Sequence, residues 1–402
     1  MTDGTTSVGP SGEDAIRTEI EDPIPRPHPS SILPAPLRIA VLMGGANTER
    51  NASLSTGTAI ARALRWVGHG VAAVDSAQSP AIPGEDPLAS FLTAEVDEEH
   101  VAETPIAPTV AAPPDLDALA RVRAQQEDGV LAPGLLPILR AADVVFVTVF
   151  GDEGESGRTQ RFLDEHGIVY TGPTPDVCEL TFDKARTKEV LADHGIDTPA
   201  WHVVRRDHIE EDLAGLSVPG PWIVKPVAGG STIGLSKVED PAELPAACEK
   251  AKAEDRDVLI EEYVEGRDLT ISALGDRVFA VVEPLTDREL YDYAAKYTPG
   301  GSRKEVPAEL PPGKTEEVRQ LTGEVHRILG IGDATSRADF KLTEDGRLLF
   351  LETNPLPGMA ARSSYPLSVG AEGVTFPELC EEIVARALRR AGRSLTDPAG
   401  SH

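Results

Sequence analysis

Short apolar runs recur along this chain, and the segments that join them change character near residue 180. Before that point RIAVLMGG (38–45), VAAVD (71–75) and DVVFVTVFG (143–151) are separated by segments with the apolar spacing of helices. Strands joined through helices are typical of a mostly parallel sheet. The sequence therefore predicts an N-terminal parallel βα domain over residues 37–182.

Beyond residue 180, tight turns join most of the strands. DVLIEEYV (257–264), DLTISALGD (268–276) and RVFAVVEPL (277–285) follow one another closely, and RADFKLTEDGRLLFLETN (337–354) has the DG pair of a hairpin. This spacing indicates antiparallel sheets with helices on one side. We expect two α+β subdomains, at 183–268 and 269–392, and an α/β (α+β) fold class for the whole chain.

Three other segments lack the pattern of a folded core. Residues 1–36 are rich in Pro, Ser, Thr, Asp and Glu, which predicts a disordered extension. Residues 76–137 interrupt the strand–helix alternation and predict an insertion on the surface of the first domain. Residues 393–402 are interpreted as a tail.

Charge and composition narrow the classes of function. A formal net charge of -28 disfavours binding to nucleic acid or to an anionic membrane. No run of 18 apolar residues and no secretory signal is visible, so we expect a cytoplasmic protein. Cys178, Cys248 and Cys380 are too widely spaced to indicate a disulfide framework or a zinc site.

The stretch KPVAGGSTIG (225–234) directly follows the apolar residues PWIV. Glycine and hydroxyl residues after a strand are typical of a loop whose backbone cradles phosphate. In the common P-loop the lysine follows the glycines, whereas here it precedes them. The stretch is therefore a candidate phosphate-binding loop of another kind.

The hairpin at 337–354 has an apolar face if Asp345 and Gly346 form a two-residue turn. Glu344 then pairs with Arg347. In this register Phe340 pairs with Leu351 and Leu342 with Leu349, and a slip by one residue would turn that face to water. The opposite face pairs Asp339 with Glu352, Arg337 with Asn354, and Lys341 with Phe350.

Two carboxylates directly opposite each other repel, and a cation between them removes the cost. Asp339, Glu352 and Asn354 would offer hard oxygen ligands on one face, which suit magnesium or manganese better than zinc. The alternative is a solvated polar face without a metal.

Five stretches, taken together and in order, resemble the ATP-grasp superfamily and, within it, the D-alanine–D-alanine ligase family. They are MGGANTERNASLSTG (43–57), DKARTK (183–188), IVKPVAGGSTIGLSKV (223–238), YDYAAKY (291–297) and RADFKLTEDGRLLFLETNPLPGM (337–359). The resemblance implies an ATP-grasp fold of two α+β subdomains after the βα domain. It also implies an ATP-dependent ligase that joins two amino acids through an acyl phosphate, and a possible homodimer.

The resemblance implies a role for each matching residue at the nucleotide. The groups implied to bind the phosphates are Lys184, Lys225, Gly230, Ser231, Thr232 and Lys296. Glu261 and Val264 would line the adenine pocket, and Asp268 would contact the ribose. Asp339, Glu352 and Asn354 match the ligands of Mg²⁺ or Mn²⁺, in agreement with the hairpin argument.

The resemblance also implies groups at the reacting amino acids. Arg337 and the backbone amide near Gly358 match donors to the tetrahedral oxyanion. Glu49 matches the residue that binds the first substrate's ammonium group. Tyr297 and Ser363 match groups near the second substrate, and Ser231 and Tyr297 resemble the residues that link to Glu49.

The chain departs from the family pattern at the first-substrate pocket. Phe150 stands where the family usually has histidine, and it cannot make the hydrogen bonds of an imidazole. Ala294 and Asn51 replace acidic residues that are common in the family. We expect D-alanyl-D-alanine synthesis for peptidoglycan. A ligase for other amino or carboxylic acids and a non-catalytic nucleotide-binding protein are the alternatives.

Overall fold

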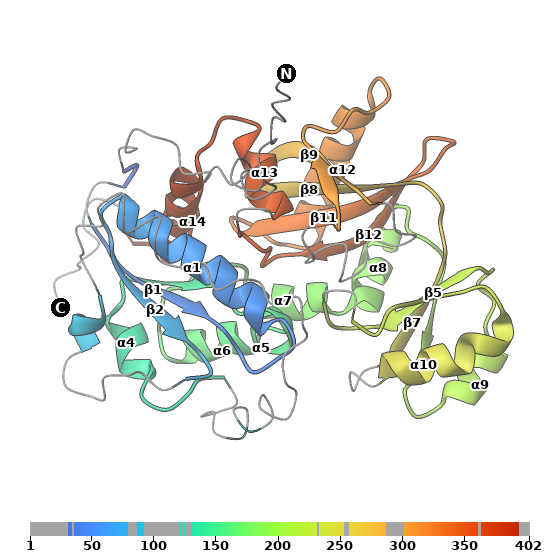
Figure 1. Cartoon of the computed structure of the whole chain (residues 1–402), viewed down its shortest axis with the longest axis horizontal. Helices are drawn as coiled ribbons and strands as arrows, with labels where there is room; N and C mark the ends of the chain where they lie inside the picture. Colours follow the sequence, from blue (N-terminus) through green and yellow to red (C-terminus); the bar gives the residue numbers. More distant parts are fainter. Residues whose placement is uncertain are drawn as a thin grey trace, which may run out of the picture.

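The computed structural model describes residues 31–33, 36–78, 87–91, 121, 124, 130–230, 233–252, 257–286, 301–360 and 363–393. They form a three-stranded, a four-stranded and a five-stranded sheet (Figure 1). Most of the predicted extension, the middle of the predicted insertion and residues 394–402 lie outside this part of the chain. Within it, no helix is long and apolar enough to cross a membrane.

The N-terminal sheet is parallel, with the strand order β2-β1-β3. Its strands are β1 (Arg38–Met43), β2 (Gly70–Asp75) and β3 (Val144–Val147). Its helices are α1 (Arg50–Trp66), α4 (Leu136–Ala141), α5 (Gly151–Glu155) and α6 (Arg158–Glu165), with the short 3-10 helix η2 (Pro87–Ser90).

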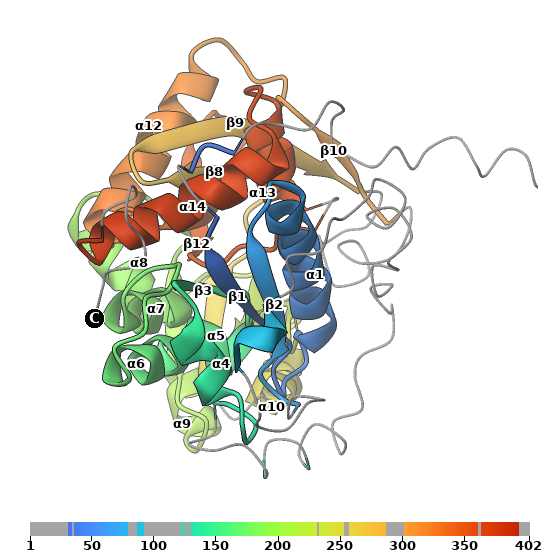
Figure 2. The same ribbon diagram turned by 90° about the vertical axis from the view of Figure 1, so that its left-hand side faces the viewer.

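The strands of this sheet are buried on both faces, which explains their unbroken apolar runs. Ile39 and Val41 pack in the core with α1, whereas Ala40 and Leu42 pack in the core with α4 and α6. Figure 2 shows α1 on one side of the sheet and α4 to α6 on the other. The predicted parallel sheet with helices in the N-terminal part of the chain is confirmed.

The middle of the chain forms an antiparallel sheet with the order β4-β7-β5-β6. Two helices lead into it, α7 (Pro175–Phe182) and α8 (Lys184–Asp193). The strands are β4 (Trp201–Val204), β5 (Trp222–Pro226), β6 (Ser236–Val238) and β7 (Val258–Glu262). Helices α9 (Ile209–Ala214) and α10 (Leu244–Lys252) pack on one face around Trp222 and Val224, and the 3-10 helix η3 (Pro241–Glu243) directly precedes α10.

The third sheet is antiparallel, with the order β10-β9-β8-β11-β12. Its strands are β8 (Arg267–Leu274), β9 (Arg277–Leu285), β10 (Arg303–Glu305), β11 (Thr335–Leu342) and β12 (Leu348–Asn354). Its helices are α12 (Lys314–Ile328) and α13 (Ser364–Gly370), and α14 (Phe376–Arg390) follows them in the chain. The two antiparallel α+β units confirm the predicted fold class.

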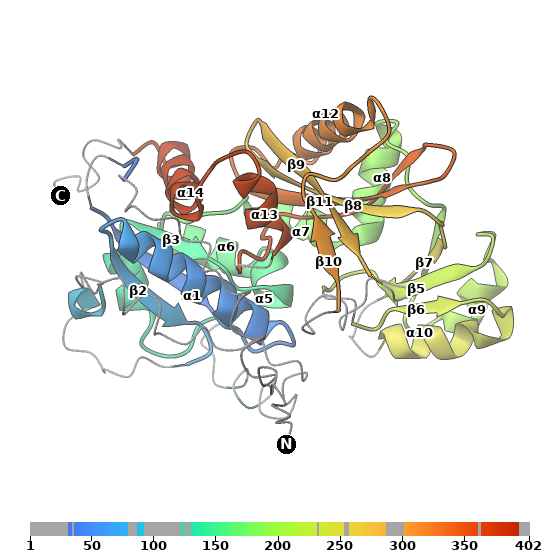
Figure 3. The ribbon, with the colours of Figure 1, turned by 45° about the horizontal axis from the view of Figure 1, so that its top comes forward.

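Helix α14 returns to the N-terminal sheet and lies beside α1 (Figures 2 and 3). Leu379, Ile383 and Leu388 of α14 belong to the same core as β1 and α1. Residues 31–33, upstream of the expected domain start at 37, also pack here. Leu33 is buried in this core, and the Ile32 amide donates to Glu381 of α14 at 2.9 Å.

The hairpin of β11 and β12 keeps only part of the predicted register. Asp339 pairs with Glu352 and Arg337 with Asn354, as predicted. A bulge after Asp339 then shifts the pairs to Phe340–Phe350, Lys341–Leu349 and Leu342–Leu348. The predicted pairs Phe340–Leu351, Leu342–Leu349 and Lys341–Phe350 are therefore wrong.

The turn of this hairpin explains the shift. The Thr343 amide donates to the Arg347 carbonyl and the Gly346 amide to the Thr343 carbonyl, both at 3.0 Å. Three residues, 344–346, thus form the loop, with Gly346 at φ 84°, so the predicted Glu344–Arg347 pair is also wrong. The bulge lets the rings of Phe340 and Phe350 meet edge to face, 5.8 Å apart, in the core.

Candidate active site

Glu49 stands at the N-terminus of α1, after a loop that begins with Gly44 and Gly45. Both glycines have positive φ, 90° and 93°. A Cβ on Gly44 would lie 2.2 Å from Asp75 Oδ1, and one on Gly45 would lie 2.7 Å from Glu153 Oε2. Only glycine therefore fits at either position.

Four side chains hold this loop by its backbone. Ser53 Oγ accepts from the Gly44 amide at 2.8 Å, and the Glu153 carboxylate accepts from the Ala46 amide at 3.0 Å. Arg50 donates to the Gly45 carbonyl at 2.9 Å and pairs with Asp75. Asn47 Oδ1 accepts from the Glu49 amide at 2.9 Å, which fixes where the helix begins. Sequence analysis missed these residues, whose only local signal was the GG pair after a strand.

Glu49 lies against the glycine-rich loop of the central unit. A Cβ on Gly230 would lie 2.6 Å from Glu49 Oε2. The structure thus brings together a predicted substrate residue and a predicted phosphate-loop residue from separate sheets. Ser231, Thr232, Lys296 and Tyr297 lie outside the described residues.

Lys184 and Lys225 lie at the end of the central sheet nearest this loop. Lys184, the first residue of α8, donates from Nζ to the Gly229 carbonyl at 2.5 Å. Lys225 on β5 pairs with Glu261 on β7, at 2.6 Å between Nζ and Oε2. Lys188 approaches the other oxygen of Glu261, at 2.7 Å. Sequence analysis missed Lys188, although its spacing of four from Lys184 places both on one face of α8.

Burial and charge act in opposite directions on these groups. Burial lowers the pKa of Lys184 and of Lys188, and the attraction of Glu261 and Glu352 offsets only part of that effect. Burial also acts to lower the pKa of Lys225, but Glu261 and Glu352 outweigh it, so that pKa is raised. The pKa of Glu261 is lowered because Lys188 and Lys225 outweigh the effect of its burial. The shifts therefore favour the ionised forms of Lys225 and Glu261, and the Glu261 carboxylate faces two lysines.

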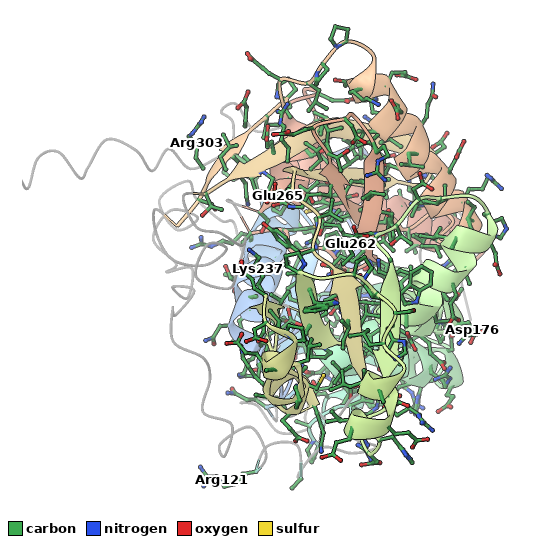
Figure 4. All side chains as sticks on the ribbon, turned by 90° about the vertical axis from the view of Figure 1, so that its right-hand side faces the viewer. Arg121, Asp176, Lys237, Glu262, Glu265 and Arg303 are labelled. Carbon is green, nitrogen blue, oxygen red and sulfur yellow. The ribbon has the colours of Figure 1, made fainter. Side chains whose placement is uncertain are left out.

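The predicted adenine and ribose residues lie on β7, on β8 and in the connection between these strands. The side chain of Glu261 is directed to the two lysines, and Val264 is half-buried in the connection to β8. Asp268 on β8 pairs with Lys341 on β11, at 2.7 Å between Oδ1 and Nζ. Figure 4 shows Glu262 and Glu265 where the central sheet meets the five-stranded sheet.

The predicted metal ligands share one region of the β11–β12 hairpin. Arg337 Nη2 lies 2.9 Å from Asp339 Oδ2 and 3.8 Å from Glu352 Oε1. One cationic group thus reaches both carboxylates, so a divalent ion could do the same. Thr270 Oγ1 donates to Asp339, and Asn354 Oδ1 accepts from the Leu356 amide at 2.8 Å.

The donor set contains two carboxylates and one amide, which fits the hard oxygen ligands of Mg²⁺. Across the residues that the structure describes, no cluster of three or more His, Cys, Asp or Glu side chains is arranged to hold a metal ion.

Glu155 joins three parts of the site and was missed by sequence analysis. Burial raises its pKa to about 8, and the charge of Glu49 adds to the effect. Hydrogen bonds from the Gly151 amide and the Asn354 side chain, and the charge of Lys184, oppose that rise. The acidic stretch GDEGES after β3 was the only sequence signal for it.

Gly358 lies between α1 and the start of α13. A Cβ on it would lie 3.4 Å from Ser363 Oγ and 3.9 Å from Thr56 Oγ1. Thr56 Oγ1 also accepts from the Met359 amide at 3.2 Å. The structure therefore brings Gly358 and Ser363 together, next to α1.

Phe150 is buried and lines a small cavity below the Gly358 segment. Thr56, Leu356, Pro357 and Met359 line the same cavity, whose volume of about 10 Å³ is near that needed for a single water. The Phe150 carbonyl accepts from Asn47 Nδ2 at 2.8 Å, so its backbone also supports the Glu49 loop.

Two family models match the chain. The model described as the D-ala D-ala ligase N-terminus matches residues 38–173, and the model of the D-ala D-ala ligase C-terminus matches residues 190–385. Together they match more than half of the chain.

Relatives named D-alanine–D-alanine ligase align along most of the chain. That of Cereibacter sphaeroides is 37% identical over 353 residues, which are 87% of this chain and 95% of the relative. That of Pediococcus pentosaceus is 32% identical over 351 residues, which are 87% of this chain and 97% of the relative.

Solved structures of a D-alanine–D-alanine ligase and of a D-Ala:D-Ser ligase share the fold. D-alanine–D-alanine ligase from Bacillus anthracis superposes with a TM-score of 0.65 at 25% identity, covering 89% of this chain and 99% of that one. The VanG D-Ala:D-Ser ligase from Enterococcus faecalis superposes with a TM-score of 0.64 at 22% identity, covering 88% of this chain and 100% of that one. The chain belongs to the D-alanine–D-alanine ligase family, which consists of ATP-dependent, ADP-forming carboxylate–amine ligases.

Proposed function

We propose that this protein joins two D-alanine molecules into D-alanyl-D-alanine for peptidoglycan, with ATP as the energy source and Mg²⁺ or Mn²⁺ as the metal. The observation that supports this proposal best is the contact of Glu49 with Gly230. A residue proposed to bind an amino acid thus lies beside a loop proposed to bind phosphate. The relatives named for this reaction support the choice of D-alanine. We further propose residues 37–182, 183–268 and 269–392 as the three domains around the site.

In the first step a carboxylate oxygen of one D-alanine attacks the γ-phosphorus of ATP and ADP leaves. Lys184 and Lys225 would neutralise charge on the phosphates, and the loop at 229–234 would cover them. The metal, held by Asp339, Glu352 and Asn354, would supply further positive charge at the phosphates. Glu49 would bind the ammonium group of this D-alanine, and the hydrogen bonds that hold its loop would fix that position.

In the second step the amine of another D-alanine attacks the acyl carbon, a proton is lost from the nitrogen, and phosphate leaves. The carbonyl oxygen becomes an oxyanion in between. Arg337 and the amide near Gly358 would donate to it, because fixed donors stabilise charge that develops in a transition state. Ser363 lies next to Gly358 and would contact the second substrate or the transferred phosphate.

The second candidate is a ligase that joins a different acid or amine. Phe150 favours it, because it stands where the family usually has a histidine, and a phenyl ring cannot make the hydrogen bonds of an imidazole. The solved structure named D-Ala:D-Ser ligase has the same fold, so this fold is also found in a protein named for a different second amino acid.

The experiment is phosphate release from ATP and Mg²⁺ with a panel of D- and L-amino acids and hydroxy acids, followed by the mass of the product. We expect release with D-alanine alone and a product of two alanines. If phosphate is released only with another acid, that acid replaces D-alanine in the proposal. If phosphate is released with none of the acids, the protein binds nucleotide without acting as a ligase. We also propose a cytoplasmic location, where ATP is made available, and a homodimer, which light scattering would detect as twice the chain mass.

A further inference from the structure

Lys341 belongs to a row of polar residues on β11 that faces away from the core. Arg337, Asp339 and Lys341 alternate along the strand with Ala338, Phe340 and Leu342, which are all buried. Phe340 and Leu342 pack in the core that contains α12. Lys341 therefore shares the face of Asp339, the proposed metal ligand.

The neighbouring strand β8 gives each of these residues a polar partner. The register places Ser272 opposite Arg337, Thr270 opposite Asp339, and Asp268 opposite Lys341. Lys341 Nζ lies 2.7 Å from Asp268 Oδ1, and the two side chains are 16% and 35% exposed. The pair is thus partly open to whatever occupies this face.

This face is turned toward the phosphate-binding lysines of the central unit. Lys188 Nζ donates to Thr198 Oγ1, which donates to the Phe350 carbonyl of β12 at 2.9 Å, so the hairpin lies beside the lysines of the central unit. Residues two apart on a strand are about 7 Å apart, so Lys341 lies one such step from Asp339 toward the hairpin turn. A nucleotide with its phosphates at Asp339 and its ribose at Asp268 would pass Lys341.

We propose that Lys341 and Asp268 act together as the ribose-binding pair of the nucleotide site. The inference rests on the proposed function, which places the metal at Asp339 and the ribose at Asp268. An ammonium group has three donors and a carboxylate has several acceptor positions. The hydrogen bond between Lys341 and Asp268 therefore leaves further donors on the ammonium group and further acceptor positions on the carboxylate. One ribose hydroxyl can donate to Asp268 while its neighbour accepts from Lys341.

Lys341 also offsets the negative charge of Asp268 beside the nucleotide. A carboxylate on its own would repel a nucleotide that carries several negative charges, whereas the Lys341–Asp268 pair is neutral as a unit. The lysine therefore lets an acidic residue bind the sugar without weakening the binding of the phosphates.

The test is the affinity for Mg²⁺-ADP and for its 2′-deoxy and 3′-deoxy analogues, measured by titration calorimetry on the full chain. In Lys341→Met the side chain keeps its length and loses its charge. We expect the dissociation constant of ADP to rise about fivefold, which is typical of one hydrogen bond lost in a partly exposed site. The dissociation constant of at least one deoxy analogue should change less than twofold, so the preference of the protein for ADP over that analogue falls.

The matched control is Lys314→Met. Lys314 also pairs with a carboxylate, Glu317, at 2.6 Å between Nζ and Oε2, but lies at the start of α12. This variant should bind all three nucleotides as the original protein does. Lys341→Arg keeps a cationic donor and should retain most of the ribose preference, and Lys341→Gln serves if the methionine variant does not fold.

Unchanged affinities in the Lys341 variants would overturn the inference, as would an equal loss for ADP and both deoxy analogues. Binding does not depend on turnover, so the outcomes separate the two proposals. Ribose preference that depends on Lys341, in a protein that releases no phosphate with any acid, would refute the ligase proposal and leave the inference standing. Failure of the unchanged protein to bind ADP would refute both.

Discussion

Replacing Glu261 by glutamine would leave two buried lysines without their counter-ion. Lys188 is 0% exposed at the side chain and Glu261 4%, and two ion pairs, at 2.7 and 2.6 Å, depend on this one carboxylate. Removal of one partner from a buried ion pair costs about 3–5 kcal/mol, since the remaining charge stays desolvated. For Glu261→Gln we therefore expect a fall of that size in the free energy of unfolding of the central unit at pH 7.5.

The cost should depend on pH. Burial already lowers the pKa of Lys188, and loss of Glu261 removes the attraction that opposes this effect. In the folded variant Lys188 then loses its proton at a pH where the unfolded lysine keeps it, up to about pH 10. Unfolding takes up a proton in this range, so stability rises with pH, by at most about 1.4 kcal/mol per pH unit. The difference in the free energy of unfolding between the variant and the original protein should therefore narrow as the pH rises from 7.5 to 9, by at most about 2 kcal/mol.

Urea unfolding followed by tryptophan fluorescence is the assay. Trp201 and Trp222 both lie in the central sheet, and Trp201 pairs with Glu261 in the register of β4 and β7. The midpoint should fall by more than about 1 M urea at pH 7.5. Glu262→Gln, at the half-buried next position of β7, is the matched control and should change the free energy by less than about 0.5 kcal/mol.

A loss below 1 kcal/mol in Glu261→Gln, or a gap that stays constant from pH 7.5 to 9, would refute this reasoning. The first result would mean that water reaches the lysines after the change. The second would mean that Lys188 keeps its proton without Glu261.

Three other substitutions test the site. Asp339→Asn should lower kcat at least about 100-fold, because it removes a proposed metal ligand, and the Mg²⁺ concentration for half-maximal rate should rise; an unchanged rate would reject the metal site. Gly230→Ala should lower kcat/KM with little change in stability, because its Cβ would meet the Glu49 carboxylate; full activity would show that the loop stands elsewhere during turnover. Phe150→His should raise kcat/KM for D-alanine relative to other acids, and an unchanged profile across the panel would show that Phe150 does not set specificity.

The sequence predicted the class of fold because each sheet type leaves a local pattern. Strands separated by helices gave the parallel sheet, and closely spaced strands gave the two antiparallel units. The bulge in the β11–β12 hairpin could not be predicted in the same way. Asp345 and Gly346 suit a two-residue and a three-residue turn, and the choice depends on how Phe340 and Phe350 pack in the core.

The candidate site shows the same limit. Asp339 and Glu352 could be paired by counting along a hairpin, which involves neighbouring strands. Lys188 and Glu153 could not be placed, because each meets its partner across a long sequence separation. Glu261 was expected at the adenine, whereas the structure places its carboxylate between two lysines whose positions depend on packing between α8 and the sheet.

The return of α14 to the N-terminal sheet has a consequence for synthesis on the ribosome. Ile383 and Leu388 complete the hydrophobic core that includes Ile39 of β1, so this core stays open until α14 has been translated. At ordinary elongation rates of roughly 5–20 residues per second, the intervening chain takes on the order of 20–70 s. Throughout that interval the part of the face beside α1 that α14 later covers is exposed, and a chaperone that binds apolar surfaces would find its target there.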